Sequence, residues 1–208
     1  MKTILNTSNQ IKAAAFAICM TAFVYPHDAE AHGKAGQRLF PATLQVEDPA
    51  VADELILPHF HSFKENEDGE TGRVTEYEAE FSKRLTERLG FSIEGAFVDQ
   101  SDEAGGNSGF ENWGLSAKYQ ALKNDEHEML ISIGFGWDIG DSGNHDVGAE
   151  DFSTLTPQVL FGKGFGDLPA SLEILKPLAL TGSAGVAMPL EADETKTLTY
   201  GFTIQYSL

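Results

Sequence analysis

Hydrophobic and polar residues alternate along most of the chain from Asp53 onward. The clearest case is MLISIGFGWDI at residues 129–139, where every second residue is large and apolar and those between are mostly small or polar. Successive side chains of a strand point to opposite faces, so this period of two predicts strands with one apolar face. We expect strands at residues 56–64, 73–84, 91–99, 111–122, 129–139, 153–163, 178–190 and 197–208.

Alternation of this kind fits two designs. In a soluble sandwich the apolar faces would meet in a core, whereas in a membrane barrel they would meet lipid. Aromatic residues stand near the ends of the apolar faces, which favours a barrel because amphipathic rings gather at the membrane interface. The aromatic residues expected at the lipid interface are Tyr77, Phe81, Trp113, Tyr119, Trp137, Tyr200 and Tyr206.

The connections alternate in length, as they do in outer-membrane barrels with long outer loops and tight periplasmic turns. Short turns are expected at 86–90 and 123–128, and long acidic loops at 64–72, 99–110, 140–151 and 191–196. The predicted fold class is therefore all-β, an antiparallel transmembrane β-barrel of about eight strands, a number that can close a barrel nearly filled by its side chains. The N-terminal part of a larger barrel is the alternative.

The N-terminus has the features of a secretory signal peptide. Lys2 and Lys12 precede or border an apolar run at 13–25, and an A-x-A cleavage pattern follows at 29–31. The run is too short for a membrane-spanning helix, which needs about 20 residues. We expect a signal peptide at 1–31, a periplasmic N-terminal segment at 32–52 that plugs or straps the barrel, and a β-barrel domain at 53–208.

Export would also remove Cys19, the single cysteine, which excludes disulfides and thiolate zinc sites from the mature chain. The net charge of −18 offers no basic surface for nucleic acid, so nucleic acid is not an expected partner. The expected location is the outer membrane. The expected partners are outer-membrane lipid, the barrel-insertion machinery and a small-molecule solute.

The polar faces of the predicted strands carry charged residues that would face the barrel interior. A ring of carboxylates there would attract cations, but the same groups could form a salt-bridge network that closes a small barrel. The pattern leaves both readings open. The lumen-facing candidates are Glu76, Glu78, Glu80, Glu94, Arg84 and Lys118.

Candidates for metal binding and catalysis are weaker. His59 and His61 share a strand face, but we find no accompanying helical H-x-x-x-H pattern or carboxylate set in the sequence, and His32 would only stand at the mature N-terminus. Ser153 with His145 and Asp146 lacks a G-x-S-x-G elbow. We therefore predict no catalytic residue, no metal ligand set and no cofactor. Loop acids without EF-hand spacing are Asp138, Asp141, Asp146, Glu150 and Asp151.

Four stretches, at 32–55, 80–93, 118–140 and 162–177, resemble a proteobacterial family of outer-membrane transporters related to the "MetA-pathway of phenol degradation" proteins. The resemblance implies a channel or transporter that passes small hydrophobic or aromatic molecules across the outer membrane, and it brings no catalytic residues. Members of that family are longer than this chain. The alternative functions are a non-transporting structural or surface barrel and, as a weaker candidate, a barrel enzyme that modifies lipid.

Overall fold

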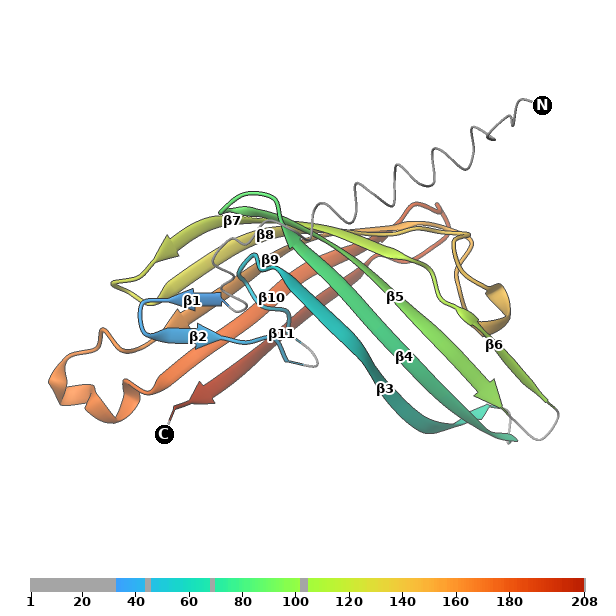
Figure 1. Cartoon of the computed structure of the whole chain (residues 1–208), viewed down its shortest axis with the longest axis horizontal. Helices are drawn as coiled ribbons and strands as arrows, with labels where there is room; N and C mark the ends of the chain where they lie inside the picture. The colour runs from blue at the N-terminus through green and yellow to red at the C-terminus, as the bar shows by residue number, and fades with distance from the viewer. Residues whose placement is uncertain (1–32, 44–45, 68–69, 102–104, 208) are drawn as a thin grey trace, which may run out of the picture.

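The computed structural model describes residues 33–43, 46–67, 70–101 and 105–207. Its main feature is one antiparallel sheet that curls into a half-barrel (Figure 1). Eight strands follow one another in chain order, and a ninth, β6 (Gly106–Phe110), pairs with β5 beyond the end of β7. The eight are β3 (Glu54–Glu67), β4 (Glu70–Arg84), β5 (Leu89–Ser101), β7 (Gly114–Asn124), β8 (Met129–Asp138), β9 (Thr154–Gly164), β10 (Leu178–Pro189) and β11 (Thr197–Tyr206).

This arrangement confirms the prediction of an all-β antiparallel fold with an up-and-down path. The predicted barrel is not closed in the described part of the chain, because β3 and β11 form the two edges of the sheet and do not pair with each other. None of the helices in the described residues is long and apolar enough to cross a membrane.

Two of the predicted long loops are instead largely strand. β3 and β4 run on as a paired ladder to Glu67 and Glu70, and β5 continues to Ser101 before β6 returns along it. The sequence pattern did not indicate these extensions, because their side chains are mostly polar and show no alternation. The ladder itself is formed by backbone N–H and C=O groups, which nearly every residue type provides. The strand expected from residue 111 consequently begins at Gly114, after the crossover from β6.

The pairing of β3 with β4 is interrupted by a β-bulge between Ile56 and His59. Pro58 lies in the bulge and has no N–H to donate to a ladder, which explains why the alternation is disturbed there. An extra residue in one strand reverses the face that later residues occupy. As a result His59 and His61 stand opposite Glu78 and Glu76.

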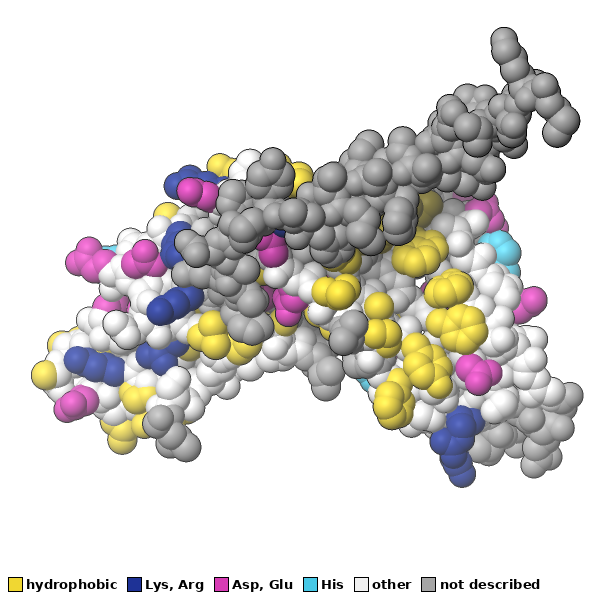
Figure 2. All heavy atoms as spheres, viewed as in Figure 1, with side chains coloured by type: hydrophobic (Ala, Val, Ile, Leu, Met, Phe, Trp, Pro, Cys, Tyr) yellow, Lys and Arg dark blue, Asp and Glu magenta, His cyan; other side chains and the backbone are white. Residues whose placement is uncertain are grey.

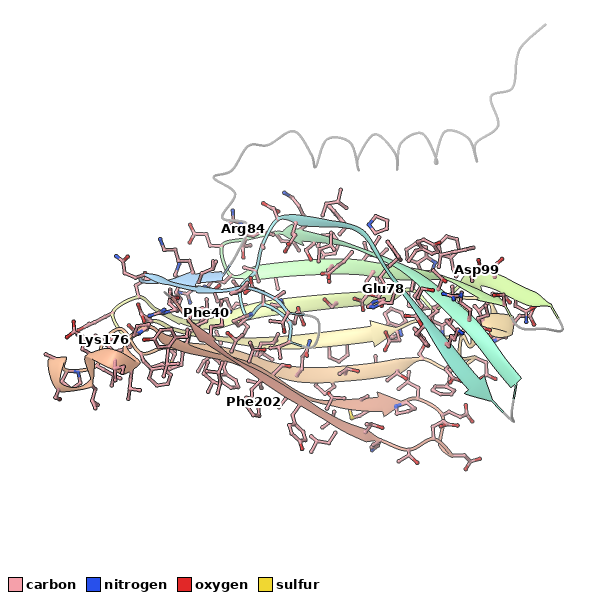
Figure 3. The ribbon with its side chains drawn as sticks, turned by 90° about the horizontal axis from the view of Figure 1, so that it is seen from below. Phe40, Glu78, Arg84, Asp99, Lys176 and Phe202 are labelled. Atoms are coloured by element: carbon pink, nitrogen blue, oxygen red, sulfur yellow. The ribbon has the colours of Figure 1, made fainter. Side chains whose placement is uncertain are left out.

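The two faces of the sheet differ in composition and in exposure. On the concave face, small or polar residues such as Ser132 and Thr181 are fully buried. On the convex face, large apolar side chains are exposed, with Ile133 at 55% and Phe202 at 66% of their accessible surface. Figure 2 shows apolar side chains gathered over β3–β5, and Figure 3 shows Phe202 at the outside of the sheet.

The concave face is covered at both ends. The hairpin of β1 (Gly33–Ala35) and β2 (Arg38–Phe40) lies inside the curl (Figure 1), and residues 46–53 continue from it to β3. At the other end, the 3-10 helix η1 (His145–Val147) brings Val147 against Val74 and Val98. A second 3-10 helix, η2 (Ala170–Leu175), lies in the connection from β9 to β10.

Candidate functional site

The described residues between 33 and 53, named here the covering segment, are bound to the middle of the sheet. The ammonium group of Lys118 on β7 donates to the carbonyl oxygens of Asp48 at 2.7 Å and Ala50 at 3.3 Å, and it forms an ion pair with Glu47. On β8 the hydroxyl of Ser132 donates to the carbonyl oxygen of Pro49. These two polar side chains of the concave face, Lys118 and Ser132, therefore find hydrogen-bond partners in backbone carbonyls of the covering segment.

Asp48 stabilises the covering segment from within. Its carboxylate accepts hydrogen bonds from the backbone N–H groups of Gly33 at 2.8 Å and Ala50 at 2.7 Å. Because these residues lie far apart in the segment, the two bonds join β1 to the stretch that leads into β3. The carboxylate is nearly buried, so these donors satisfy it where water cannot.

An apolar contact fixes the hairpin against β9. The ring of Phe40 is fully buried in a cluster with Ala35, Leu130 and Ala179. It lies directly over Gly162, where an added Cβ would come within 2.7 Å of the ring. Glycine at this position therefore makes the room that the ring needs.

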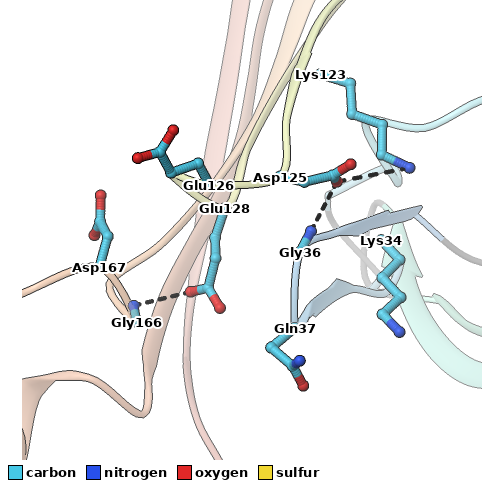
Figure 4. A pocket seen from close by; sticks show the side chains of 9 residues that line it. All are labelled: Lys34, Gly36, Gln37, Lys123, Asp125, Glu126, Glu128, Gly166 and Asp167. Carbon is cyan, nitrogen blue, oxygen red and sulfur yellow. Dashed lines mark hydrogen bonds and ion pairs between the residues drawn. The ribbon is translucent and has the colours of Figure 1, made fainter.

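Arg38 joins the hairpin to the short-turn end of the sheet. Its guanidinium donates to the carbonyl oxygens of Lys176 at 2.7 Å and Pro177 at 3.0 Å, and it forms an ion pair with Glu128 at 3.4 Å. Glu128 also accepts from the backbone N–H of Gly166 at 2.9 Å (Figure 4). The planar guanidinium of arginine carries several N–H donors in fixed directions, so it can make these contacts simultaneously, whereas the single ammonium group of a lysine could not.

A polar cleft of about 560 Å³ opens between the β1–β2 turn and the turns of the sheet (Figure 4). On one side the N–H of Gly36 donates to the carboxylate of Asp125 at 2.8 Å. On the other, Asp167 interacts with His127 at 2.9 Å and with Lys163. The hydrogen bond from His127, followed by that from Lys163, holds the pKa of Asp167 below its usual range. Both charge types line the cleft, so it has no clear preference for one sign of ligand.

A second cavity, of about 270 Å³, lies on the concave face beyond the covering segment. Five carboxylates line it, and we call it the acidic chamber. Ile56, Ala96 and Asn112 are among its other walls. The carboxylates are those of Glu78, Glu80, Glu94, Glu111 and Asp138.

Three of these acids, Glu78, Glu80 and Glu94, were among the lumen-facing candidates, and the structure brings them together. Asp138 lies on the polar face of β8, as the alternation at residues 129–139 predicts, and it is separate from the other acids with which it was grouped as a loop residue. Glu111 could not be found from the sequence, because it lies in the crossover after β6. Burial raises the pKa of Glu111, and the negative charges of Glu76 and Glu78 raise it further.

The basic lumen-facing candidates do not neutralise the chamber. Lys118 is bound to the covering segment, and the backbone N–H of Arg84 donates to Asp53 at 2.9 Å while its guanidinium lies 3.9 Å from that carboxylate. Burial raises the pKa of Asp53, but hydrogen bonds from Lys83 and from the backbone of Arg84 outweigh it and leave the pKa lowered. Within the described ranges, no Lys or Arg forms an ion pair with Glu94, Glu111 or Asp138.

The predicted interface aromatics in the strands lie on the convex face. Tyr119, Trp137 and Tyr200 are exposed to 47%, 40% and 76%. Phe81 is half-buried against Phe91. Trp113, just before β7, stacks on Phe110 at 5.8 Å and lies against Gly95 of the convex face. Tyr77 and Tyr206 are also exposed.

The structure separates the residues of the other candidate sites. Ser153 accepts a hydrogen bond from Gly140, whereas His145 contacts the carbonyl of Ala149 at 2.7 Å and Asp141 at 3.2 Å. Of the described residues, the loop acids do not assemble a group of three metal donors; the one such group is His61, Glu76 and Glu78. We expected no carboxylates beside His61 from the sequence, and this expectation is wrong, because Glu76 and Glu78 lie next to it. His32 and the predicted signal peptide lie outside the described residues.

No protein-family model, curated protein or solved structure matches this chain. The resemblance to the transporter family of phenol-degradation pathways accordingly stays a prediction.

Proposed function

We propose that this chain is an outer-membrane β-barrel protein, or the β-barrel part of one, whose convex face contacts lipid. One observation carries the proposal: large apolar side chains are exposed along the convex face, whereas the covered concave face carries mostly small and polar residues together with a few apolar ones such as Leu130 and Leu160. A protein folded in water shows the reverse, because burying a large apolar side chain contributes about 1.5–3 kcal/mol. Lipid tails would supply that burial here.

The soluble sandwich is the rival design, and it needs a second layer over the apolar face. In the described residues the additional elements β1, β2 and residues 46–53 pack on the other face, where Phe40 and Leu130 form a small cluster. The convex residues Phe60, Ile204 and Tyr200 are left exposed to 66% or more. The signal peptide predicted at residues 1–31 adds the expectation of export and of delivery to the insertion machinery.

Within this barrel, the acidic chamber favours a passive channel with a preference for small cations. Carboxylates along a narrow passage attract cations and repel anions. The alternative of an internal salt-bridge network loses support, because Lys118 and Arg84 are engaged with the covering segment. The acidic lining also favours small cationic or polar solutes over the hydrophobic compounds that the family resemblance implies.

A non-transporting barrel is the second candidate, and the covering segment favours it. Residues 46–53 lie on the concave face against Lys118 of β7 and Ser132 of β8, and they would narrow any passage through it. The two functions share the same fold and differ in whether solutes pass, so conductance distinguishes them.

The membrane placement is tested with the chain's two tryptophans, Trp113 and Trp137, which both lie on the convex face. The protein is refolded into vesicles that contain phospholipids brominated at different acyl depths, and tryptophan emission is recorded. Quenching by brominated tails is expected. Emission that is quenched by aqueous iodide and untouched by brominated lipid would refute the placement.

The channel is tested in planar bilayers under a KCl gradient. A cation-selective reversal potential is expected, and Glu80→Gln combined with Glu94→Gln should move it toward zero. Glu173→Gln serves as the matched control, because Glu173 is an exposed carboxylate of η2 away from the chamber. Bilayers that stay silent with correctly inserted protein would support the non-transporting barrel.

A further inference from the structure

Three potential metal ligands meet across the first two strands of the main sheet. One nitrogen of His61 and one carboxylate oxygen each of Glu76 and Glu78 all lie within 4.8 Å of one another. His61 Nε2 and Glu78 Oε2 are 3.8 Å apart. The group combines an imidazole with two carboxylates, a mixed donor set that a solvated acidic face does not require.

The pairing register explains why these groups meet. His61 on β3 is the direct cross-strand partner of Glu76 on β4, and Glu78 is the next residue of β4 on the same face. Directly opposed residues of an antiparallel pair have Cβ atoms about 4.5–5.5 Å apart, within reach of a shared ion. Two paired strands also hold the ligands more rigidly than a loop would.

The β-bulge at Pro58 is part of this arrangement. Without the extra residue between Ile56 and His59, the following residues of β3 would take the opposite phase, and His61 would point to the convex face. The bulge therefore places an imidazole among the carboxylates of the concave face.

We propose that His61, Glu76 and Glu78 bind a divalent first-row transition metal ion, for which Zn²⁺ is the probe. Zinc accepts imidazole nitrogen and carboxylate oxygen together, and three protein ligands leave a further position for water or solute. Glu80 continues the row of carboxylates along β4, and Glu111 interacts electrostatically with both Glu76 and Glu78. This negative surround favours a cation. The site goes beyond the proposed channel, since it needs only the folded β3–β4 ladder.

The test is a calorimetric titration of the whole folded chain in detergent with ZnCl₂ at pH 7.5. We expect one saturable site in the wild type, and His61→Gln or Glu76→Gln should lower its zinc affinity at least about tenfold. This is a minimum, because loss of a residue that only supports a metal ligand already lowers metal affinity about 10–100-fold. Binding of Co²⁺ should give visible absorption bands that are lost in the same variants. Heat-modified electrophoretic mobility verifies that each variant is folded.

Two matched controls make the result specific. His145→Gln removes a histidine that forms an ion pair with Asp141 at 3.2 Å and lies outside the triad, and Glu80→Gln removes a concave-face acid of β4 outside the triad. His145→Gln should bind zinc like the wild type, and Glu80→Gln, which removes a neighbouring charge but no ligand, should weaken binding far less than His61→Gln does. Uptake that is non-saturable, or lowered as much by Glu80→Gln as by His61→Gln, would overturn the proposal. Conductance in chelator-treated buffer is measured separately, so failure of the metal site leaves the channel question distinct.

Discussion

Lys118 and Asp48 are 70 positions apart in the chain, yet the ammonium group of Lys118 donates to the backbone carbonyl oxygen of Asp48 at 2.7 Å. The lysine lies on the concave face of β7 with only 14% of its side chain exposed. Its charge is thus compensated by the covering segment, through two carbonyl oxygens and the carboxylate of Glu47. This contact binds the N-terminal residues to the centre of the sheet.

Replacing Lys118 by methionine should loosen the covering segment while the sheet stays folded. The variant loses hydrogen bonds from a charged donor, each of which contributes about 1.5–3 kcal/mol to stability when it is buried. The contribution of the ion pair with Glu47 is smaller, because solvent screens that partly exposed carboxylate. Amide hydrogen exchange of residues 46–52 should accelerate, and conductance should rise if this segment narrows the passage. Lys123→Met is the control, because among the described residues Lys123 forms its ion pair with the exposed Asp125, at 3.9 Å, and not with residues 46–52. Unchanged exchange in Lys118→Met would show that Phe40 and Arg38 hold the segment without it.

The apolar convex face gives a second prediction. Ile133 lies in the middle of β8, paired with Tyr119 and Val159. In a bilayer, Ile133→Arg should lower the free energy of unfolding by about 2–4 kcal/mol, whereas Leu155→Arg near the start of β9 should cost about 0–1 kcal/mol. Urea unfolding in lipid vesicles measures both. If the convex face met water instead, Ile133→Arg would change stability by less than about 0.5 kcal/mol.

The fold was predictable from the sequence wherever one face of a strand is apolar and the other small. Strands 129–138 and 197–206 match the alternation closely, because in them large apolar residues lie on the convex face and mostly small or polar residues on the concave face. The extensions of β3, β4 and β5 were not predictable, because their ladders are formed by backbone groups and their residues do not alternate between apolar and polar. The open edges at β3 and β11 carry no mark in the residue pattern either.

The acidic chamber and the metal-ligand triad were also predictable only where their residues follow the alternation of a strand. Glu78, Glu80 and Glu94 follow the strand phase and could be assigned to one face from the sequence. Glu111 lies in a crossover, where no periodicity applies. The triad of His61 with Glu76 and Glu78 depends on the register between two strands and on a bulge, and a single sequence does not determine either.

The loop that carries η1 gives a prediction of pH dependence. The hydrogen bond to the carbonyl oxygen of Ala149, followed by the interaction with Asp141, raises the pKa of His145 against the opposing effect of desolvation. A raised pKa means that the protonated form favours the folded loop. This stabilisation is therefore present below the unfolded pKa of about 6.5 and is lost as the pH rises through the raised value.

Hydrogen exchange of residues 141–149 measures this effect. At about pH 5.5 the wild type should protect these amides more than His145→Gln does, and the difference should shrink toward about pH 9 as the imidazole loses its proton. Protection that differs equally at both pH values would mean that the ring acts by packing or as a neutral donor, and the proposed role of its charge would be wrong.

The contact between Phe40 and Gly162 predicts how the hairpin can be displaced. A Cβ at residue 162 would lie 2.7 Å from the ring of Phe40, so Gly162→Ala must move the ring or β9. Overpacking of this kind typically costs about 1–3 kcal/mol. Limited proteolysis should then cut residues 33–40 faster than in the wild type. At Gly136 an added Cβ would meet Thr156 at an ordinary 3.6 Å, so Gly136→Ala is the matched control and should leave cleavage unchanged.

A double variant separates this contact from a general weakening of β9. If the clash with the ring is the cause, Gly162→Ala should add little to the effect of Phe40→Ala, because the shortened side chain leaves room for the new methyl group. Residues that share a contact couple in this way, whereas independent sites add. Cleavage rates that multiply in the double variant would show that Gly162→Ala acts through the strand itself, and the hairpin would then be held chiefly by Arg38 and its carbonyl partners.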